Sequence, residues 1–542
     1  MRVLARNLNV RQPALLRARP GSQVSRTDSV PAPVGGWNAR DPIGQMDPKD
    51  AITLDNWWPL PSFLRVRRGQ NRYARSLPST VESLLPYNAA NGTTALFAAS
   101  STSFYDVTSA GVVGAAVVSS LTNARWDSVN FTNSSGTSYL CCFNGVDSPR
   151  FWDGTTWTAI TAASTPAITG VTPSLLLGPV VFKRRIFAIE TGTLNVWYLP
   201  VDAVGGAATK LSLAGIARRN GKLVALGTWT IDAGEGSDDH FVAVTSEGDV
   251  IVYKGTDPSS SSTWAVIGVW ALGSPVGGTR CLTQFAGDML YLCSDGLVPL
   301  SAALQTTRTN SRVALSDKIQ NALRDSISSY SSNFGWSVSF FPTLQMICIN
   351  VPVDTSTSSP TYYQYVMNTI SKAWARFTNL NARCWAQQDT NIFYGDNTLT
   401  RKFDASEYDE DTSGTAVNIA TDVKQAFHYF GTRGQLKKFN MARPILLASS
   451  APSVLLGLNV DYEDAAPASS LNFASLFTAG KWDSALWDSG VWGGSAEVLR
   501  LWQTLPAKPG MCAALRMMLT QKNIKIEWHS TDWLYELGGV VG

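Results

Sequence analysis

Short apolar runs recur along most of this chain, and each is followed by a turn and a second run that ends near an aromatic residue. Apolar runs of about 4–8 residues bounded by Gly, Asp and Asn are typical of β-hairpins. The paired runs are 95–99 with 103–107, 139–145 with 150–157, 185–189 with 194–198, 241–245 with 249–255, 289–293 with 295–300 and 392–396 with 399–404. The pattern predicts an all-β chain built from repeated hairpins.

The spacing of these hairpins indicates how they are arranged. Apart from one wider gap they recur at roughly 45–55 residues, which is the length of a four-stranded propeller blade. Radial repetition of small sheets also protects the sheet edges. We therefore expect residues 81–405 to form a β-propeller of about six blades.

One stretch in the wider gap has helical periodicity. Its apolar residues at near-helical spacing are Val313, Ile319, Leu323 and Ile327. A helix start is indicated near Ser316 and Asp317, because Ser and Asp favour N-terminal capping positions. The stretch predicts a helical insertion at about 311–330 that packs on the outside of the propeller.

The segments outside the repeat differ from it in composition. Residues 1–30 lack periodicity and predict a basic arm, and the turn-rich residues 31–80 predict a segment that packs on the propeller. Residues 406–420 begin with an acidic loop at 407–411, continue with Thr, Ser and Gly, and predict a linker. Further strand-like runs predict a separate, sandwich-like β domain over residues 421–542.

Composition supports this fold class. Charged residues make up only 16% of the chain and 19 residues are Trp, a balance that suits sheets with aromatic edges. A helical bundle would need far more Ala, Leu, Glu and Lys. The seven Cys have no regular spacing, which predicts reduced, buried thiols and assembly in a cytoplasm. No apolar stretch approaches the about 18 residues of a membrane span, and we expect neither membrane insertion nor a secretion signal.

Positive charge gathers in two places, although the net charge is only +3. The arm carries six Arg before Val30, and two interpretations stay open: a solvated arm, or an arm that lies on DNA or an acidic neighbour. A strand-like run at 63–69 carries Arg65, Arg67 and Arg68. These three are candidates for occasional phosphate contacts in a DNA-conducting lumen, or for pairing with acids on a neighbouring subunit.

Signals for catalysis or cofactor binding are absent from the sequence. The three His are scattered, no His/Cys cluster has zinc spacing, and no phosphate-binding loop, nucleophile elbow or EF-hand loop occurs. We therefore predict a protein that is not an enzyme and has no cofactor, metal site or catalytic residue. The harder case is the Gly-rich loop that carries Asp232, Glu235, Asp238 and Asp239. It is either a solvated turn or a source of the carboxylate pair that glycosidases use.

A Trp-rich segment stands out in the C-terminal part. Trp482, Trp487 and Trp492 are five residues apart, and two of them precede Asp. That spacing matches neither a helix nor a strand. We expect either burial against the C-terminal sheet or, since Trp is enriched at interface anchors, contact with a neighbouring subunit.

Several phrases, in order along the chain, resemble the tail-tube nozzle proteins of short-tailed bacteriophages, also described as tubular tail protein B or packaged-DNA stabilisation protein. The phrases are 35–42 (GGWNARDP), 50–59 (DAITLDNWWP), 65–69 (RVRRG), 365–369 (YVMNT) with Ala373 and Trp374, the Trp-Asp repeat near 482–488, and 528–536 (WHSTDWLYE). The likeness runs from about residue 35 to the C-terminus, and the arm matches nothing.

The resemblance implies a structural protein of the virion tail. It implies a homohexameric ring below the head-to-tail adaptor ring, with tail fibres or spikes on its outer wall. It further implies that the ring retains the packaged genome and conducts phage DNA, without sequence preference, during ejection. The alternative from the residues themselves is a carbohydrate-binding or depolymerising β-propeller.

Overall fold

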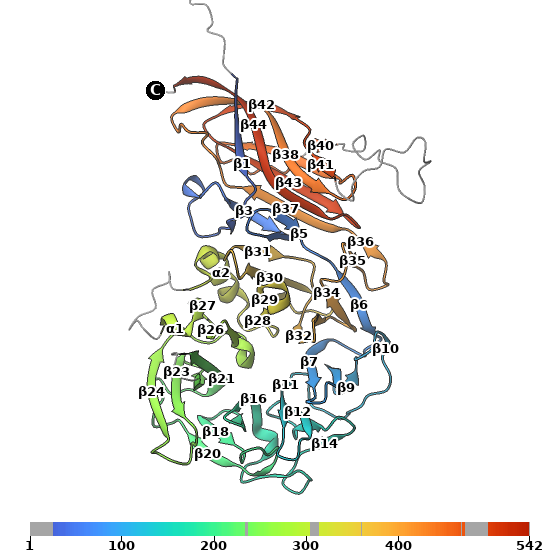
Figure 1. The fold of residues 1–542 in the computed structure, drawn as a ribbon, viewed down its shortest axis with the longest axis vertical. Helices are drawn as coiled ribbons and strands as arrows, with labels where there is room; N and C mark the ends of the chain where they lie inside the picture. The colour runs from blue at the N-terminus through green and yellow to red at the C-terminus, as the bar shows by residue number, and fades with distance from the viewer. Residues whose placement is uncertain are drawn as a thin grey trace, which may run out of the picture.

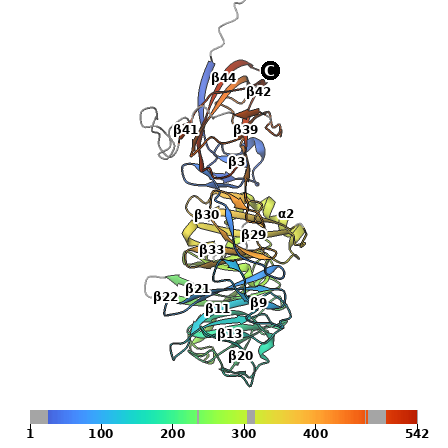
Figure 2. The same cartoon turned by 90° about the vertical axis from the view of Figure 1, so that its right-hand side faces the viewer.

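The computed structural model describes residues 25–232, 237–303, 314–358, 360–467, 469–471 and 497–540. Its strands form two bodies. A ring of small sheets occupies one end, and a two-sheet β-sandwich stands on the rim of that ring (Figure 1). The view from the side shows the two bodies stacked along the long axis (Figure 2). The expected all-β fold of a propeller with a C-terminal sandwich is confirmed.

Antiparallel sheets follow one another around the ring, as the hairpin repeat predicts. Within the described residues the first six sheets are β7–β9 (Val81–Asn88, Thr94–Ser100, Ser103–Asp106), β11–β14 (Asp127–Thr132, Ser138–Phe143, Arg150–Trp152, Trp157–Ala159), β16, β17, β18 and β20 (Leu176–Phe182, Arg185–Glu190, Asn195–Tyr198, Thr209–Ser212), β21–β24 (Leu223–Asp232, Ser237–Thr245, Asp249–Gly255, Trp264–Ala271), β25–β27 (Leu282–Phe285, Asp288–Cys293, Gly296–Pro299) and β28–β31 (Ser337–Phe341, Met346–Asp354, Thr361–Asn368, Trp374–Phe377). Separate apolar cores fill the spaces between neighbouring blades.

The seventh sheet closes the ring by joining distant parts of the chain. It contains β32 (Cys384–Gln388), β33 (Asn391–Gly395) and β34 (Leu399–Phe403), and β34 pairs antiparallel with β6 (Gln70–Arg75) from the N-terminal part. The short β10 (Gly111–Val112) pairs parallel with β6 at the edge. Strand β32 lies against β7 of the first blade. The ring is therefore held shut by hydrogen bonds between residues more than 300 positions apart.

The ring has seven blades where the hairpin spacing predicts about six. The additional blade is β28–β31, which lies in the wider gap of the repeat. Strand β29 is buried along Met346–Val351, on both faces. It therefore has no alternation of polar and apolar residues, so it lacks the signature of a half-exposed strand.

The helix expected in the same gap is present. A short 3-10 turn (η5, Asp317–Ile319) leads into α2 (Gln320–Tyr330), whereas residues 311–313 lie outside the described ranges. One face of α2 packs against β27 and β29, and its Leu323 and Ile327 belong to the largest apolar core. The opposite face, with Arg324 and Asp325, is exposed. A second helix, α1 (Leu300–Ala303), follows β27.

The sandwich is built from both ends of the chain. One sheet holds β1 (Ser25–Pro31), β4 (Trp57–Pro59), β5 (Leu64–Val66), β38 (Gln435–Ala448), β41 (Glu497–Leu499), β42 (Gln503–Gly510) and β44 (Ile526–Val540). The other holds β2 (Gly36–Trp37), β3 (Asp50–Asp55), β37 (Ile419–Gln425), β39 (Val454–Val460), β40 (Ser469–Leu471) and β43 (Ala513–Gln521).

This arrangement corrects two of the expected boundaries. Residues 25–30 of the expected arm belong to β1, which pairs with β44 over its whole length. Most of the segment expected to pack on the propeller instead supplies β2–β5 to the sandwich. Sequence alone could not reveal this, because each short strand is completed by partners near the C-terminus. Residues 1–24 lie outside the described ranges.

The two bodies share one sheet and one core. Strand β3 pairs with β37 of the sandwich and, through Asp55 and Arg376, with β31 of the ring. The result is a sheet of ten strands that runs from the sixth blade into the sandwich. The expected linker contains the hairpin β35–β36 (Asp409–Glu410, Ala416–Val417). In the described residues, none of the helices has the length and apolar character to cross a lipid bilayer.

Closure of the ring gives a direct prediction. Ala74 on β6 is fully buried, whereas Ala110 is exposed. We expect Ala74→Glu to destabilise the protein strongly, because a charge without a partner would be buried at the seam. Ala110→Glu, the matched control, should change the unfolding midpoint little. Urea unfolding followed by Trp fluorescence measures both, and equal midpoints for the two variants would show that the seam does not support the fold.

Candidate functional site

The three arginines expected to contact DNA lie at the junction between ring and sandwich. Arg65 is in the middle of β5, and Arg67 and Arg68 follow in the turn that leads to β6 in the ring. Strand β5 pairs with β4 and β44. The chain therefore passes from one body to the other at these residues.

Arg67 is buried and all of its donors are used. Its side chain forms a two-pronged pair with Asp409, with Nη1 to Oδ1 at 2.9 Å and Nη2 to Oδ2 at 2.7 Å. Nε donates to Asn56 Oδ1 at 2.8 Å, and the remaining N–H groups reach the carbonyls of Arg68 and Thr378. Only 2% of Arg67 is exposed. The prediction that Arg67 lines a DNA-conducting lumen is therefore wrong.

Asn56 completes this buried network. Its Nδ2 donates to Thr378 Oγ1 and to the Ala420 carbonyl, while its Oδ1 also accepts from the Thr378 N–H. Its backbone is left-handed, with φ 60°, a conformation that Asn tolerates better than most residues. Asn56, Arg67 and Asp409 thus connect the sandwich, the ring and the segment between them.

Arg65 and Arg68 lie beside acids of the same chain. Arg68 contacts Asp404 at 3.3 Å and Glu407 at 3.5 Å. Burial raises the pKa of the Asp404 and Glu407 carboxyls, and the guanidinium groups of Arg68 and Arg65 oppose that rise. Arg65, Arg68 and Asp404 line a cavity of about 170 Å³ beside Trp58 and Phe403.

These neighbours change the electrostatics of the arginine run. Arg65, Arg67 and Arg68 are accompanied by Asp404, Glu407 and Asp409, so the cluster has no net charge. The acids belong to this chain, not to a neighbouring subunit as the alternative interpretation proposed. DNA contact by Arg65 and Arg68 stays a prediction.

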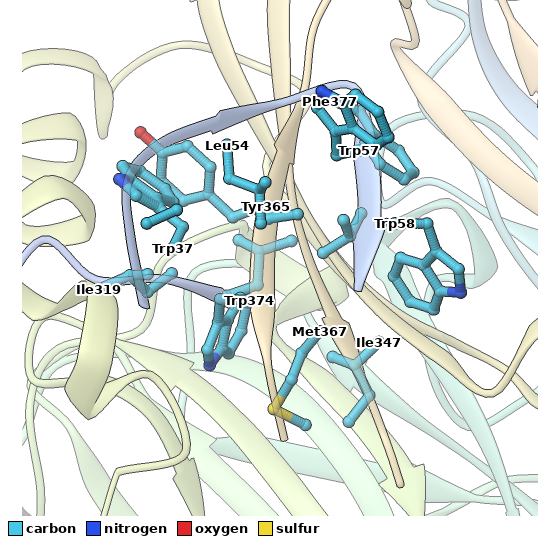
Figure 3. Packing of buried hydrophobic residues seen from close by; sticks show 14 of the residues in the cluster. Trp37, Leu54, Trp57, Trp58, Ile319, Ile347, Tyr365, Met367, Trp374 and Phe377 are labelled. Carbon is cyan, nitrogen blue, oxygen red and sulfur yellow. The ribbon is translucent and has the colours of Figure 1, made fainter. Parts of the chain in front are cut away.

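Aromatic side chains surround the same junction (Figure 3). Trp37 of β2 packs edge-on against Tyr365 of β30, with ring centroids 5.2 Å apart. Trp58 packs against Phe377 of β31 at 6.1 Å. Trp374 donates its Nε1–H to the Leu315 carbonyl. The junction is thus a continuation of the protein interior.

A second candidate site lies on the axis of the ring. A cavity of about 350 Å³ is lined from all seven blades, by Leu84 and Pro86, by Trp126, Asp127 and Ser128, by Gly178 and Pro179, by Leu226, by Thr279, Arg280 and Leu282, by Ser337, Val338 and Ser339, and by Cys384, Trp385 and Ala386. Most of these residues lie on, or just before, the first strand of a blade.

Arg280 spans this axis. It comes from η3 (Gly278–Cys281), just before β25, and its Nη atoms donate to the Glu82 carbonyl, Ser83 Oγ and the Trp126 carbonyl in the first two blades. Its Nε lies 3.6 Å from an oxygen of Asp127. The guanidinium therefore ties opposite sides of the ring together and narrows the axial channel.

Sequence reasoning missed the axial residues because they are isolated along the chain. Asp127 begins β11, Ser337 begins β28, and Arg280 precedes β25 by two positions. A polar residue at the start of a blade's first strand is the signal that would have identified them. That signal requires the blade boundaries, which the degenerate repeat does not provide.

The other sequence candidates lie in the β21–β22 hairpin or outside the described residues. In the β21–β22 pair, Asp232 lies opposite Ser237 and Asp238 lies opposite Ile231. Asp239 makes an ion pair with Lys183 at 2.6 Å. Glu235, Trp482, Trp487 and Trp492 lie outside the described residues.

The structure also shows where the cysteine thiols lie and whether possible metal ligands come together. All seven Cys are free and buried, as expected, and burial raises the pKa of the thiols, including Cys384 to about 11. In the described part of the chain, no group of three or more His, Cys, Asp and Glu could hold a metal ion.

Similarity to known proteins is confined to weak structural matches. No family model and no curated protein matches the chain. Similar solved structures include Sqt1 of Saccharomyces cerevisiae (10% identity, 66% of this chain, 96% of that chain, TM-score 0.29) and the WD40 domain of SCAP from fission yeast (7%, 60%, 84%, 0.27). A family 43 glycoside hydrolase, an arabinoxylan arabinofuranohydrolase from Bacillus subtilis, matches at 10% identity over 92% of this chain and 99% of that chain, with a TM-score of 0.26. At these scores the matches carry no argument about function.

The buried network predicts a large difference between neighbouring arginines. Arg67→Met should cost about 3–5 kcal/mol of unfolding free energy, because it leaves the Asp409 carboxylate buried without its partner. Arg68→Met, at a half-exposed pair, should cost about 1 kcal/mol or less. Urea unfolding of the two variants measures the difference. Similar losses would mean that the junction does not depend on Arg67.

Proposed function

We propose that this chain is a tail-tube, or nozzle, protein of a short-tailed bacteriophage. Six copies form a ring in the virion tail, below the head-to-tail adaptor and beside the fibres or spikes. The ring retains the packaged genome and conducts the DNA during ejection. The protein assembles in the host cytoplasm and acts as a structural component without catalysis.

The observation that supports the proposal is that those phrases resembling nozzle proteins that lie in the described residues contact one another. A Cβ at Gly36 would lie 2.6 Å from backbone atoms of Trp374, and one at Gly69 would lie 1.7 Å from the Tyr408 carbonyl oxygen. Both positions therefore require glycine. Asn368 Nδ2 donates to the Pro59 carbonyl at 3.0 Å, joining two further phrases.

The last phrase, at 528–536, belongs to the same unit. The Trp57 and Trp528 rings pack 6.2 Å apart, and both residues are fully buried. Segments separated by up to about 490 positions thus form one junction between ring and sandwich. The resembling phrases lie together at the junction. Such clustering supports an architecture shared with nozzle proteins better than phrases scattered over the surface would.

The axis of one propeller is unsuited to DNA, which favours a lumen between subunits. The axial cavity has a volume of only about 350 Å³ and is crossed by Arg280. A DNA duplex, whose major groove alone is about 12 Å wide, is too broad to pass through it. A genome that slides needs weak phosphate contacts, because each neutralised phosphate adds affinity through counterion release. The near-neutral net charge of +3 suits such a wall.

An exposed sheet edge offers a surface for neighbouring copies. Strand β24 is the outermost strand of its blade, and its sequence, WAVIGVWA, has neither a charge nor a proline. Ile267 is 47% exposed. Unprotected apolar edges pair readily with other chains. We therefore take β24 as one candidate for the subunit contact and the Trp482–Trp492 segment as another.

The alternative, a depolymerising propeller, has less support. Most glycosidases need two carboxylates that face one cavity, and Asp127 is the one carboxylate among the residues lining the axial cavity. Incubation with host polysaccharide and an assay for reducing ends separates the two functions. Release of reducing ends that Asp127→Asn abolishes would favour the enzyme.

Assembly is the first test of the proposal. Electron microscopy of the purified protein should show six-fold rings. Ile267→Lys, and Trp482, Trp487 and Trp492 all replaced by Ala, should each reduce ring formation while leaving a folded monomer, because each variant weakens an inter-subunit surface. Ile267→Val keeps the edge apolar and is the matched control. Particles without six-fold symmetry under all conditions would contradict the proposal.

DNA binding is the second test. Assembled rings should bind duplex DNA weakly and without sequence preference, with an affinity that falls steeply as salt rises. Fluorescence anisotropy with two unrelated duplexes over a salt series measures this. A tight, sequence-selective complex that survives high salt would contradict a conducting lumen.

A further inference from the structure

The axial cavity has the construction of a ligand site. Its volume of about 350 Å³ lies in the usual range for small-molecule pockets, roughly 300–1,000 Å³. All seven blades contribute to its wall. Closure of the ring therefore holds the wall in place, and no single loop has to fold around a ligand.

One buried polar group in this wall lacks a partner. Ser337, the first residue of β28, is 6% exposed, and its hydroxyl makes no hydrogen bond. Buried hydroxyls in proteins are nearly always hydrogen-bonded, because leaving one unpaired costs free energy. The hydroxyl oxygen itself has almost no accessible surface, so a polar ligand in the cavity would supply the missing bond once the Ser337 side chain turns toward it.

The charges in the wall restrict the ligand. Arg280 is committed to carbonyl and hydroxyl oxygens of the first two blades, and its Nε lies 3.6 Å from Asp127. The two charges balance, so the cavity is close to neutral. An anion would meet the Asp127 carboxylate, and a cation would meet the Arg280 guanidinium. Both are disfavoured relative to a neutral ligand.

The remaining wall residues favour a ligand with many hydroxyls. Asp127 is an acceptor, and the hydroxyls of Ser128, Ser337 and Ser339 both donate and accept. The Trp385 indole and aliphatic residues give the cavity apolar surface as well. A purely apolar ligand would leave Ser337 unpaired, whereas a sugar ring has both hydroxyls and apolar C–H faces.

We propose that the axial cavity binds a neutral, polyhydroxylated ligand the size of a single sugar ring, with its hydroxyls donating to Asp127 and bonding Ser337. The site lies within one subunit. It therefore goes beyond the proposed conduit and does not depend on ring assembly.

Saturation-transfer difference NMR tests the site with a panel of free ligands. The panel contains neutral hexoses, an N-acetylhexosamine and myo-inositol, with a uronic acid and a protonated amino sugar as charged counterparts. We expect at least one neutral member to bind, and to bind better than its charged counterparts, because the cavity wall is neutral overall.

Two variants locate the binding. Ser337→Ala should weaken the best ligand about threefold to tenfold, as expected for one hydrogen bond, and Asp127→Asn should weaken it at least as much. Ser119→Ala, an exposed serine outside the cavity, is the matched control. Circular dichroism and thermal unfolding check that each variant is folded.

Three outcomes would overturn the proposal. They are no binding by any neutral member at high millimolar concentration, equal binding by wild type and by both cavity variants, and tightest binding by a charged member. Loss of six-fold rings with sugar binding retained would contradict the proposed conduit alone. Rings without sugar binding would contradict this inference alone.

Discussion

The buried pair between Arg67 and Asp409 is the interaction on which the two-body architecture depends. Taking a guanidinium and a carboxylate out of water is costly, and is tolerated when both are paired and their remaining hydrogen-bonding groups are satisfied. Asn56, Arg68 and Thr378 supply those further partners. The network requires the turn after β5, the end of β31 and the start of β35 to meet at one point. A chain that placed any of them elsewhere would leave a buried charge without its partner.

From that point the N-terminal part of the chain enters both bodies. Strands β1–β5 complete the sandwich, and β6 closes the ring against β34. The bodies also share the ten-stranded sheet and a common apolar core. Ring closure and sandwich formation are therefore coupled, and the chain behaves as one unit.

The proposed activities occupy different parts of the molecule. The outer edge of β24 is exposed, and in the proposed conduit DNA would pass between copies, because Arg280 crosses the propeller axis. The axial cavity is a separate internal site, with polar groups that neither the proposed assembly nor the proposed conduction would use. Asp404 and Glu407 lie beside Arg65 and Arg68 and balance their charge, which explains why a run of basic residues need not be a nucleic-acid surface.

The sequence by itself determined the all-β class, the hairpin repeat, the helix at α2 and the presence of further strands in the C-terminal part, because these follow from local periodicity and turn residues. It also identified Arg67, Trp57 and Trp374 as notable, but not what they contact. The blade β28–β31 was not predicted, because a strand that is buried on both faces has no alternation of polar and apolar residues. The β6–β34 seam, the pairing of β1 with β44, the Arg67–Asp409 pair and the meeting of Asp127, Arg280 and Ser337 were decided only by the tertiary structure. Each joins residues tens to hundreds of positions apart, and burial and charge pairing between such residues leave no local pattern in the chain.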